Sequence, residues 1–200
     1  MLRAACWVLA VGTALVVCSA PAAPAADDDE MVVNPHYKYW ANFKKGATVT
    51  RLEKTAFSGP AKEQVPDGID QKEITMTLLA VSPDSVTVEV VVSERDFLDT
   101  IVSAPTKKIY PAKVKKSHLR AGLHGVDPKM GKDSLDVLGK KLDCVTASGT
   151  EKKDDVEVDH KIWLSEMVPG GIVKHTRTTK QGGKTVADTT IVVKSYKAAE

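Results

Sequence analysis

The sequence predicts a mostly β protein: a single curved antiparallel sheet, a meander resembling half of a barrel, with a short aromatic helix at its N-terminal end. Two observations predict it. β-branched residues alternate with polar ones over much of the chain, which is the period-two pattern of strands with one wet face. The joints between these runs are short and rich in glycine, proline and aspartate, which is typical of hairpin turns.

The clearest element is a meander in the last third of the chain. Its strands are expected at Lys141–Glu151, Val156–Met167, Ile172–Thr179 and Thr185–Tyr196. The joints Pro169-Gly170-Gly171 and Gln181-Gly182-Gly183 are strong turn signals. Both faces of this meander carry apolar residues, so we expect both faces to be covered, or one of them to line a cavity.

Pairing the meander's strands across their joints predicts a register. A four-residue joint that pairs Glu151 with Val156 places Cys144 opposite Trp163. In the last hairpin, pairing Gln181 with Lys184 places Arg177 opposite Asp188. Opposite charges on a mostly apolar face should be paired, because an unpaired buried charge is costly. The sequence therefore predicts a structural ion pair between Arg177 and Asp188.

The middle of the chain alternates strands with loops. Further strands are expected at Ala47–Phe57, Lys72–Val81, Ser85–Glu94, Thr106–Lys116 and Asp133–Leu138, and loops at Ser58–Gln71 and Ser117–Lys132. Arg95–Ala104 fits a short helix or an irregular strand equally well. Pro111 places the strand 106–116 at an edge or a bulge, because proline cannot donate to a ladder.

The aromatic helix is expected to begin at Asn34 and to end at Gly46. Asn34 is a good N-cap, Pro35 suits the first turn and glycine suits the position after a helix. Tyr37, Trp40 and Phe43 would share one face. So short a helix must dock that face on the sheet, either as a core plug or as an aromatic platform for a ligand.

The N-terminal residues predict export. Residues 1–25 read as a signal peptide, with Arg3 before an apolar run that ends in small residues, and 26–33 as a flexible acidic lead. Residues 34–200 would form a single antiparallel β domain. The protein is therefore expected to be secreted or periplasmic. Lipid anchoring at Cys18 is the less favoured alternative, since Val17 does not suit a lipidation motif.

The sequence indicates no enzyme, cofactor or nucleic-acid partner. The formal net charge is only +2, too balanced for nucleic-acid binding. No histidine pair has the spacing of a zinc-binding helix, and Cys144 lacks a second cysteine for a metal site. Cys144 and His160 are expected on opposite faces of their hairpin, which argues against a thiol–imidazole pair. We therefore expect neither catalytic nor metal-binding residues.

Lysines gather on the expected edge strand: Lys107, Lys108, Lys113, Lys115 and Lys116. Edge lysines discourage pairing with other molecules. The same lysines could contact the anionic headgroups of a membrane surface. Both interpretations stay open.

Three segments carry a resemblance to a known family. They are Gly139–Cys144, Lys161–Ser165 with its tryptophan, and Val168–Lys174 with its Pro-Gly-Gly turn. The chain is similar to uncharacterised secreted bacterial β-proteins, and its meander resembles the curved half-barrel of periplasmic lipoprotein carriers of the LolA/LppX type. The resemblance implies an open sheet that encloses an apolar cavity. It implies no catalytic residue.

The resulting hypothesis is an exported binding module for an apolar or amphiphilic, lipid-like ligand in the bacterial envelope. The expected ligand-binding residues are apolar and come from the helix and the meander: Tyr37, Trp40, Phe43, Trp163, Met167, Ile172 and Ile191. The alternative is an envelope-associated structural or interaction protein with no ligand cavity. A cavity of several hundred Å³ is what distinguishes the two.

Overall fold

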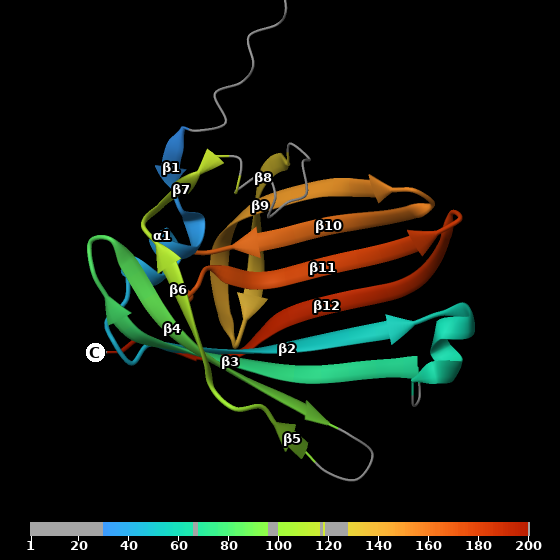
Figure 1. Ribbon diagram of the computed structural model, residues 1–200, viewed down its shortest axis with the longest axis horizontal. Coiled ribbons are helices and arrows are strands. Elements are labelled where there is room, and N and C mark those ends of the chain that lie inside the picture. The colour runs from blue at the N-terminus through green and yellow to red at the C-terminus, as the bar shows by residue number, and fades with distance from the viewer. Residues whose placement is uncertain (1–29, 66–67, 96–99, 117, 119–127, 200) are drawn as a thin grey trace, which may run out of the picture.

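The computed structural model describes residues 30–65, 68–95, 100–116, 118 and 128–199, and it confirms the predicted fold class (Figure 1). Most of these residues belong to one large antiparallel sheet. The elements are β1 Met31–Val33, α1 Pro35–Ala41, β2 Thr48–Phe57, the 3-10 helix η1 Gly59–Gln64, β3 Ile69–Val81, β4 Ser85–Arg95, β5 Thr100–Val102, β6 Thr106–Pro111, β7 Lys113–Lys115, β8 Lys129–Val137, β9 Lys140–Lys153, β10 Val156–Leu164, β11 Ile172–Gln181 and β12 Lys184–Lys197.

The sheet is an open meander that begins and ends with hairpins. Its strand order is β5-β4-β3-β2-β12-β11-β10-β9-β8, and β6 pairs with β4 along the same edge as β5. β2 pairs with β12, so the first and last long strands lie side by side at the centre. The small sheet of β1 and β7 stands apart at one end of the molecule (Figure 1).

The predicted four-strand meander is confirmed, but the register of its first hairpin differs by two residues. Asp154 adopts a left-handed φ of 57°, which aspartate tolerates, so a two-residue turn suffices. Val156 consequently pairs with Lys153, and Trp163 lies opposite Thr146. The expected pairing of Cys144 with Trp163 is therefore wrong. A slip of two residues nevertheless keeps both side chains on one face.

The predicted Arg177–Asp188 ion pair is also wrong. Gln181 pairs with Lys184 as expected, but the register then shifts at a bulge between Thr179 and Lys180. A shift of one residue exchanges the faces of a strand. Arg177 therefore lies opposite Thr189, to whose Oγ1 its Nη2 donates at 3.4 Å. Asp188 accepts from Thr178 Oγ1 at 2.7 Å on the other face.

Helix α1 forms where the capping signals predict it and is shorter than expected. The Asn34 side chain accepts a hydrogen bond from the backbone N–H of His36 at 3.0 Å, and Pro35 occupies the first turn. The helix ends at Ala41. Gly46 instead forms a separate turn, with a φ of 92°, and donates to Leu78 O at 2.8 Å. Trp40 is 1% exposed, so the core-plug interpretation holds for it.

Several boundaries differ from the sequence-based prediction, and the expected strand Thr106–Lys116 divides into β6 and β7, which belong to different sheets. Met31–Val33, expected in the flexible acidic lead, forms β1 because it finds a partner strand in β7. β8 begins at Lys129 rather than 133, because β9 is long enough to pair with it. β10 ends at Leu164 and not at Met167, which lies in the following loop and is 65% exposed. The ambiguous segment 95–104 contains the short strand β5.

The two faces of the sheet are distinguished by the residues at its centre. The Arg51 face carries Arg51, with Ile74 and Val193 directly opposite it on the neighbouring strands, and it continues through His175 to Ile162. The Trp163 face carries Trp163, Cys144, Thr146 and Lys174. Buried residues occur on both faces, so the prediction of a two-sided core is confirmed.

Candidate functional site

Arg51 is a buried cation at the centre of the sheet. Its side chain lies on the same side of β2 as the buried Val49 and Thr55, and it is 8% exposed. Nη1 contacts Met76 Sδ at 3.5 Å, and Nη2 donates to the carbonyl oxygen of Gly170 at 3.4 Å. Nε is buried and has no hydrogen-bond partner among the described residues. The thioether is a weak acceptor and the contact to Gly170 is long, so the guanidinium uses little of its donor capacity.

No carboxylate among the described residues pairs with Arg51. The acid nearest to it along β2, Glu53, pairs with Lys72 at 3.2 Å. Burial lowers the pKa of Arg51 to about 10, and the guanidinium therefore remains charged at neutral pH. A buried charge without a counter-ion is costly, and such groups gather at functional sites.

Two further basic groups and a phenol surround Arg51. Lys108 and Tyr110 of β6 lie opposite Val88 and Val86, which places them on the Arg51 face. The His36 ring stacks on Tyr110, with 5.0 Å between ring centroids and 23° between planes. Part of His36 is exposed, but Tyr110 covers one side of its ring.

The pKa shifts of these neighbours report the same positive charge. The pKa of His36 is lowered, first by burial of its ring against Tyr110 and then by the charges of Arg51 and Lys108. The pKa of Tyr110 is raised by burial, and Arg51 opposes that shift. The region around Arg51 therefore has a positive potential without a compensating acid among the described residues.

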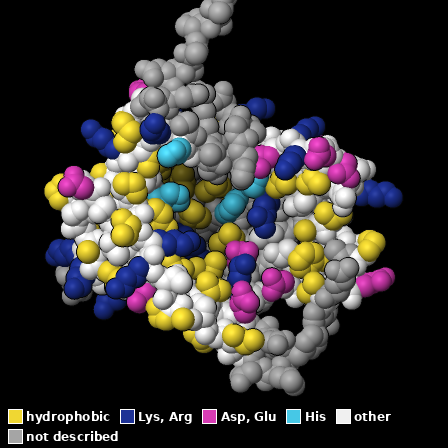
Figure 2. Space-filling view, viewed as in Figure 1, with side chains coloured by type: hydrophobic (Ala, Val, Ile, Leu, Met, Phe, Trp, Pro, Cys, Tyr) yellow, Lys and Arg dark blue, Asp and Glu magenta, His cyan; other side chains and the backbone are white. Residues whose placement is uncertain are grey.

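The molecule is hollowed on the side shown in Figure 2. Hydrophobic side chains form the floor of the hollow, and histidine and basic side chains gather around it. An apolar floor with polar groups at its edge is the usual composition of a ligand site.

Two histidines and a glutamate form a chain of contacts further along the Arg51 face. His160 Nδ1 lies 3.3 Å from His175 Nε2, and the two rings stack with 5.6 Å between their centroids. His160 Nε2 lies 3.1 Å from Glu151 Oε1, which is an ion-pair distance, although the N–H is not aligned for a hydrogen bond. The pKa of His175 is lowered to about 4, by burial first and then by His160 and Arg177.

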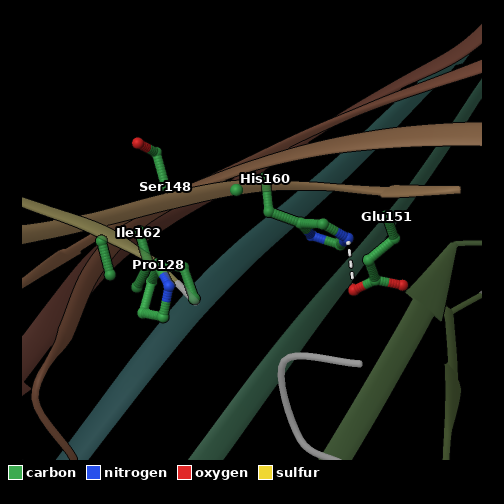
Figure 3. A pocket seen from close by; sticks show the side chains of 7 residues that line it. Pro128, Ser148, Glu151, His160 and Ile162 are labelled. Carbon is green, nitrogen blue, oxygen red and sulfur yellow. Dashed lines mark ion pairs between the residues drawn. The ribbon is translucent and has the colours of Figure 1, made fainter. Parts of the chain in front are cut away.

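A small cavity of about 20 Å³ adjoins this chain. Its lining residues are Pro128, Ala147, Ser148, Gly149, Glu151, His160 and Ile162. Figure 3 shows the His160 ring turned toward Glu151, while the Ser148 hydroxyl points away from both. Ser148 is therefore not placed as a nucleophile beside His160. A cavity of this volume holds at most about one water molecule.

The depressed pKa of His175 predicts acid sensitivity. Its pKa is about 4 in the folded protein and 6.5 ordinarily, so the unfolded chain binds the proton more readily between these values. The stabilisation is complete above pH 6.5 and is lost as pH falls toward 4. His175→Gln keeps a polar partner for His160 but cannot titrate in this range. On acidification, we expect its free energy of unfolding to fall by roughly 1–2 kcal/mol less than that of wild type, a value reduced to allow for the partial exposure of His175.

Urea denaturation at pH 7 and at pH 4.5 measures this difference. Equal losses of unfolding free energy in wild type and His175→Gln would contradict the prediction. The comparison cancels the carboxylates whose own titration also destabilises the protein at low pH, because both proteins share them.

A groove lies between the β8–β9 hairpin and strands β11 and β12. Its volume is about 250 Å³. Six of its eight described lining residues are valines and leucines, and the full set is Leu135, Asp136, Val137, Leu138, Val173, Lys174, Val192 and Val193. Lys174 and Asp136 add one charge of each sign. The exposed lining is divided between polar and apolar atoms, so the groove suits an amphiphilic ligand better than a wholly apolar one.

Trp163 lies next to this groove, held between two lysines and an aspartate. The Nζ atoms of Lys161 and Lys174 lie 4.5 and 5.1 Å from the indole centroid. The indole Nε1 donates to Asp133 Oδ2 at 2.9 Å, and this hydrogen bond is the main reason that the pKa of Asp133 is lowered. Trp163 is 7% exposed, and the ammonium of Lys174 lies over the face of its ring.

Four of the seven predicted ligand-binding residues belong to or pack against the hydrophobic core: Trp40 and Trp163 within it, Tyr37 and Phe43 against it. None of the seven lines the groove or the small cavity. Trp40 is buried in the core, and Tyr37 donates from its hydroxyl to Ser82 O at 3.0 Å. Ile191 lies opposite His175 on the Arg51 face, whereas Met167 is exposed in a loop. Phe43 and Ile172 are partly buried.

The sequence contained signals for two of the missed groups. Arg51 shares its side of an alternating strand with Val49, and a cation beside a buried valine is unusual. His160 and His175 lie on one face of neighbouring strands, and the register brings their rings together diagonally. The groove had no local signal, because it forms where the β8–β9 hairpin approaches strands β11 and β12.

Comparison with known proteins adds no assignment: no family model, curated protein or solved structure matches this chain. Within the described ranges, no helix has the length and apolar character to cross a membrane. The same residues contain no group of three side chains placed to hold a metal ion. Cys144 is free and buried, and it lies on the face opposite His160.

Proposed function

We propose that this chain is an exported protein that binds an apolar or amphiphilic, lipid-like ligand. The supporting observation is the 250 Å³ groove lined by valines and leucines between β8 and strands β11 and β12. This volume accepts part of an acyl chain rather than a whole lipid, since sites for drug-sized ligands are larger. Each methylene that enters the groove contributes about 0.8 kcal/mol of favourable transfer free energy.

Lys174 gives the proposed ligand a polar end. Lys174 lines the groove and its ammonium lies over the Trp163 ring, so the position of the charge is defined before a ligand arrives. An anionic headgroup beside Lys174 and an acyl chain along the apolar wall would satisfy both kinds of surface. The open antiparallel sheet is compatible with the proposed resemblance to LolA/LppX-type carriers, in which a curved sheet receives acyl chains.

Filling the groove tests this function. Val192 lines the groove and is partly buried, so Val192→Trp should occupy the volume that a ligand would take. We expect the affinity for N-phenyl-1-naphthylamine, a neutral apolar fluorophore, to fall by more than about tenfold, because the loss of roughly two buried methylenes already costs that much. Native mass spectrometry of the protein from its own host should show a lipid-sized adduct in wild type and less of it in the variant.

Val145→Trp is the matched control. Val145 is 41% exposed on β9, it does not line the groove, and the same side chain is introduced. Its affinity for the fluorophore should equal that of wild type. If both variants bind the fluorophore as wild type does, or if neither the dye nor a co-purifying lipid binds wild type, the groove is only a surface feature and the proposal fails.

A further inference from the structure

We propose that Arg51 is the centre of a second, separate site, which binds an oxyanion: a carboxylate or phosphate group. The inference rests on a guanidinium that is buried, charged and without a counter-ion among the described residues. It does not depend on the apolar groove, because Arg51 does not line that groove.

The first step is that Arg51 has donors to spare. The two contacts of the guanidinium engage Nη1 and Nη2 at 3.5 and 3.4 Å, and one of the acceptors is a thioether, which is weak. Nε has no acceptor among the described residues. An oxyanion can accept from two N–H groups of one guanidinium at once, the geometry for which arginine is preferred over lysine.

The second step is that the surroundings favour negative charge. Lys108 and Tyr110 share the face of Arg51, and the stacked His36 brings its ring to the same place. The Tyr110 hydroxyl can donate to an anion. Glu53, two positions from Arg51 on the same strand, is occupied by Lys72 at 3.2 Å and does not serve as the counter-ion.

The third step excludes a purely structural role. A buried cation that stabilises a fold does so through a paired acid or through several carbonyl acceptors. Arg51 has one carbonyl contact, at 3.4 Å, and a sulfur. An arriving oxyanion would supply the missing acceptors, and the hydrophobic surroundings of Ile74, Met76 and Val193 would strengthen the interaction.

The experiment measures anion binding by NMR and calorimetry on the full mature chain. Because the Arg51 Nε–H is buried, it should exchange slowly and give its own signal in an ¹H–¹⁵N spectrum. Three probes are titrated: inorganic phosphate, dodecyl phosphate below its micelle concentration, and dodecyltrimethylammonium as the cationic match. We expect a phosphate-bearing probe to shift the Arg51 Nε–H signal and the cationic amphiphile to leave it in place.

Variants show whether Arg51 carries the binding. Removing a hydrogen bond to a charged group costs roughly tenfold or more in affinity, so Arg51→Met should bind the phosphate probe at least about tenfold more weakly. Arg51→Lys keeps the charge but cannot donate two parallel hydrogen bonds to one oxyanion. Its affinity for the phosphate probe should therefore lie between those of wild type and Arg51→Met. Arg177→Met, which removes an exposed arginine from the same face, should bind as wild type does.

Each outcome decides the proposal. Binding of both phosphate probes identifies a site for the free oxyanion, and binding of dodecyl phosphate alone identifies a site for the headgroup of an anionic amphiphile. If no phosphate probe binds wild type, or if Arg51→Lys and Arg51→Met bind it as wild type does, the proposal is overturned. If Arg51→Met does not fold, Arg51→Lys and the Nε–H shift still decide. Val192→Trp should leave phosphate binding unchanged, which separates this site from the groove.

Discussion

Replacing Arg51 with methionine is expected to raise the free energy of unfolding of the unliganded protein by about 2 kcal/mol. The physical reason is that methionine fills a similar volume and removes a buried charge that has no partner acid among the described residues. The substitution loses the contact of Nη1 with Met76 Sδ, a weak acceptor, and the hydrogen bond from Nη2 to Gly170 O, which is 3.4 Å long. Urea denaturation at neutral pH measures the change as a higher midpoint at constant slope.

Arg177→Met is the control for this stability change. Arg177 is exposed on the same face, and its one described hydrogen bond, to Thr189 Oγ1, is 3.4 Å long. We expect its unfolding free energy to stay within about 0.5 kcal/mol of wild type. A lower midpoint for Arg51→Met would mean that the guanidinium stabilises the fold. It would remove the argument that Arg51 is retained for binding at a cost in stability.

Gly171→Ala is expected to destabilise the protein by about 3 kcal/mol or more. Gly171 has a φ of 75°, where a side chain is strained, and an added Cβ would overlap the ring of Tyr39. Gly170 beside it has a φ of 72°, and a Cβ there would come within 2.9 Å of the Trp40 indole. The loop before β11 can therefore pack against α1 only where it has no side chains.

Gly182→Ala separates the overlap from the backbone strain. Gly182 has a φ of 56°, similar to that of Gly171, but an added Cβ would meet no atom within 4 Å. Its substitution should cost only the strain, about 1 kcal/mol. Thermal or urea unfolding of both variants measures the difference. If Gly171→Ala were no more destabilising than Gly182→Ala, α1 would not be held by this contact.

The capping and turn residues made the elements predictable. Asn34 and Pro35 mark the start of α1, and the short joints of the meander mark the ends of its strands. These signals are local, because a cap or a turn is satisfied within a few residues. The alternation of β2 put Arg51 on one side of the strand with Val49 and Thr55, and the structure shows that this side is buried at Arg51.

The register and the site were not predictable in the same way. In the β9–β10 turn, the left-handed Asp154 moved the pairing by two residues. In the β11–β12 hairpin, a bulge moved the pairing by one residue and separated Arg177 from Asp188. Neither event changes the apolar pattern of the strand, so the pattern could not signal it. The seven expected ligand-binding residues were likewise chosen by chemical type: Trp40 and Trp163 lie in the core, whereas Met167 is exposed in a loop.

The sequence by itself determined that this protein is a meander of antiparallel strands with a capped aromatic helix and apolar residues on both faces, because periodicity and turn chemistry act over short stretches of chain. Only the tertiary structure decided which side chains are neighbours. It left Arg51 without an acid among the described residues, placed His160 against His175, and formed a groove between the β8–β9 hairpin and strands β11 and β12. Such neighbours come from strands far apart in the chain, and their placement depends on bulges and bends that cost little locally.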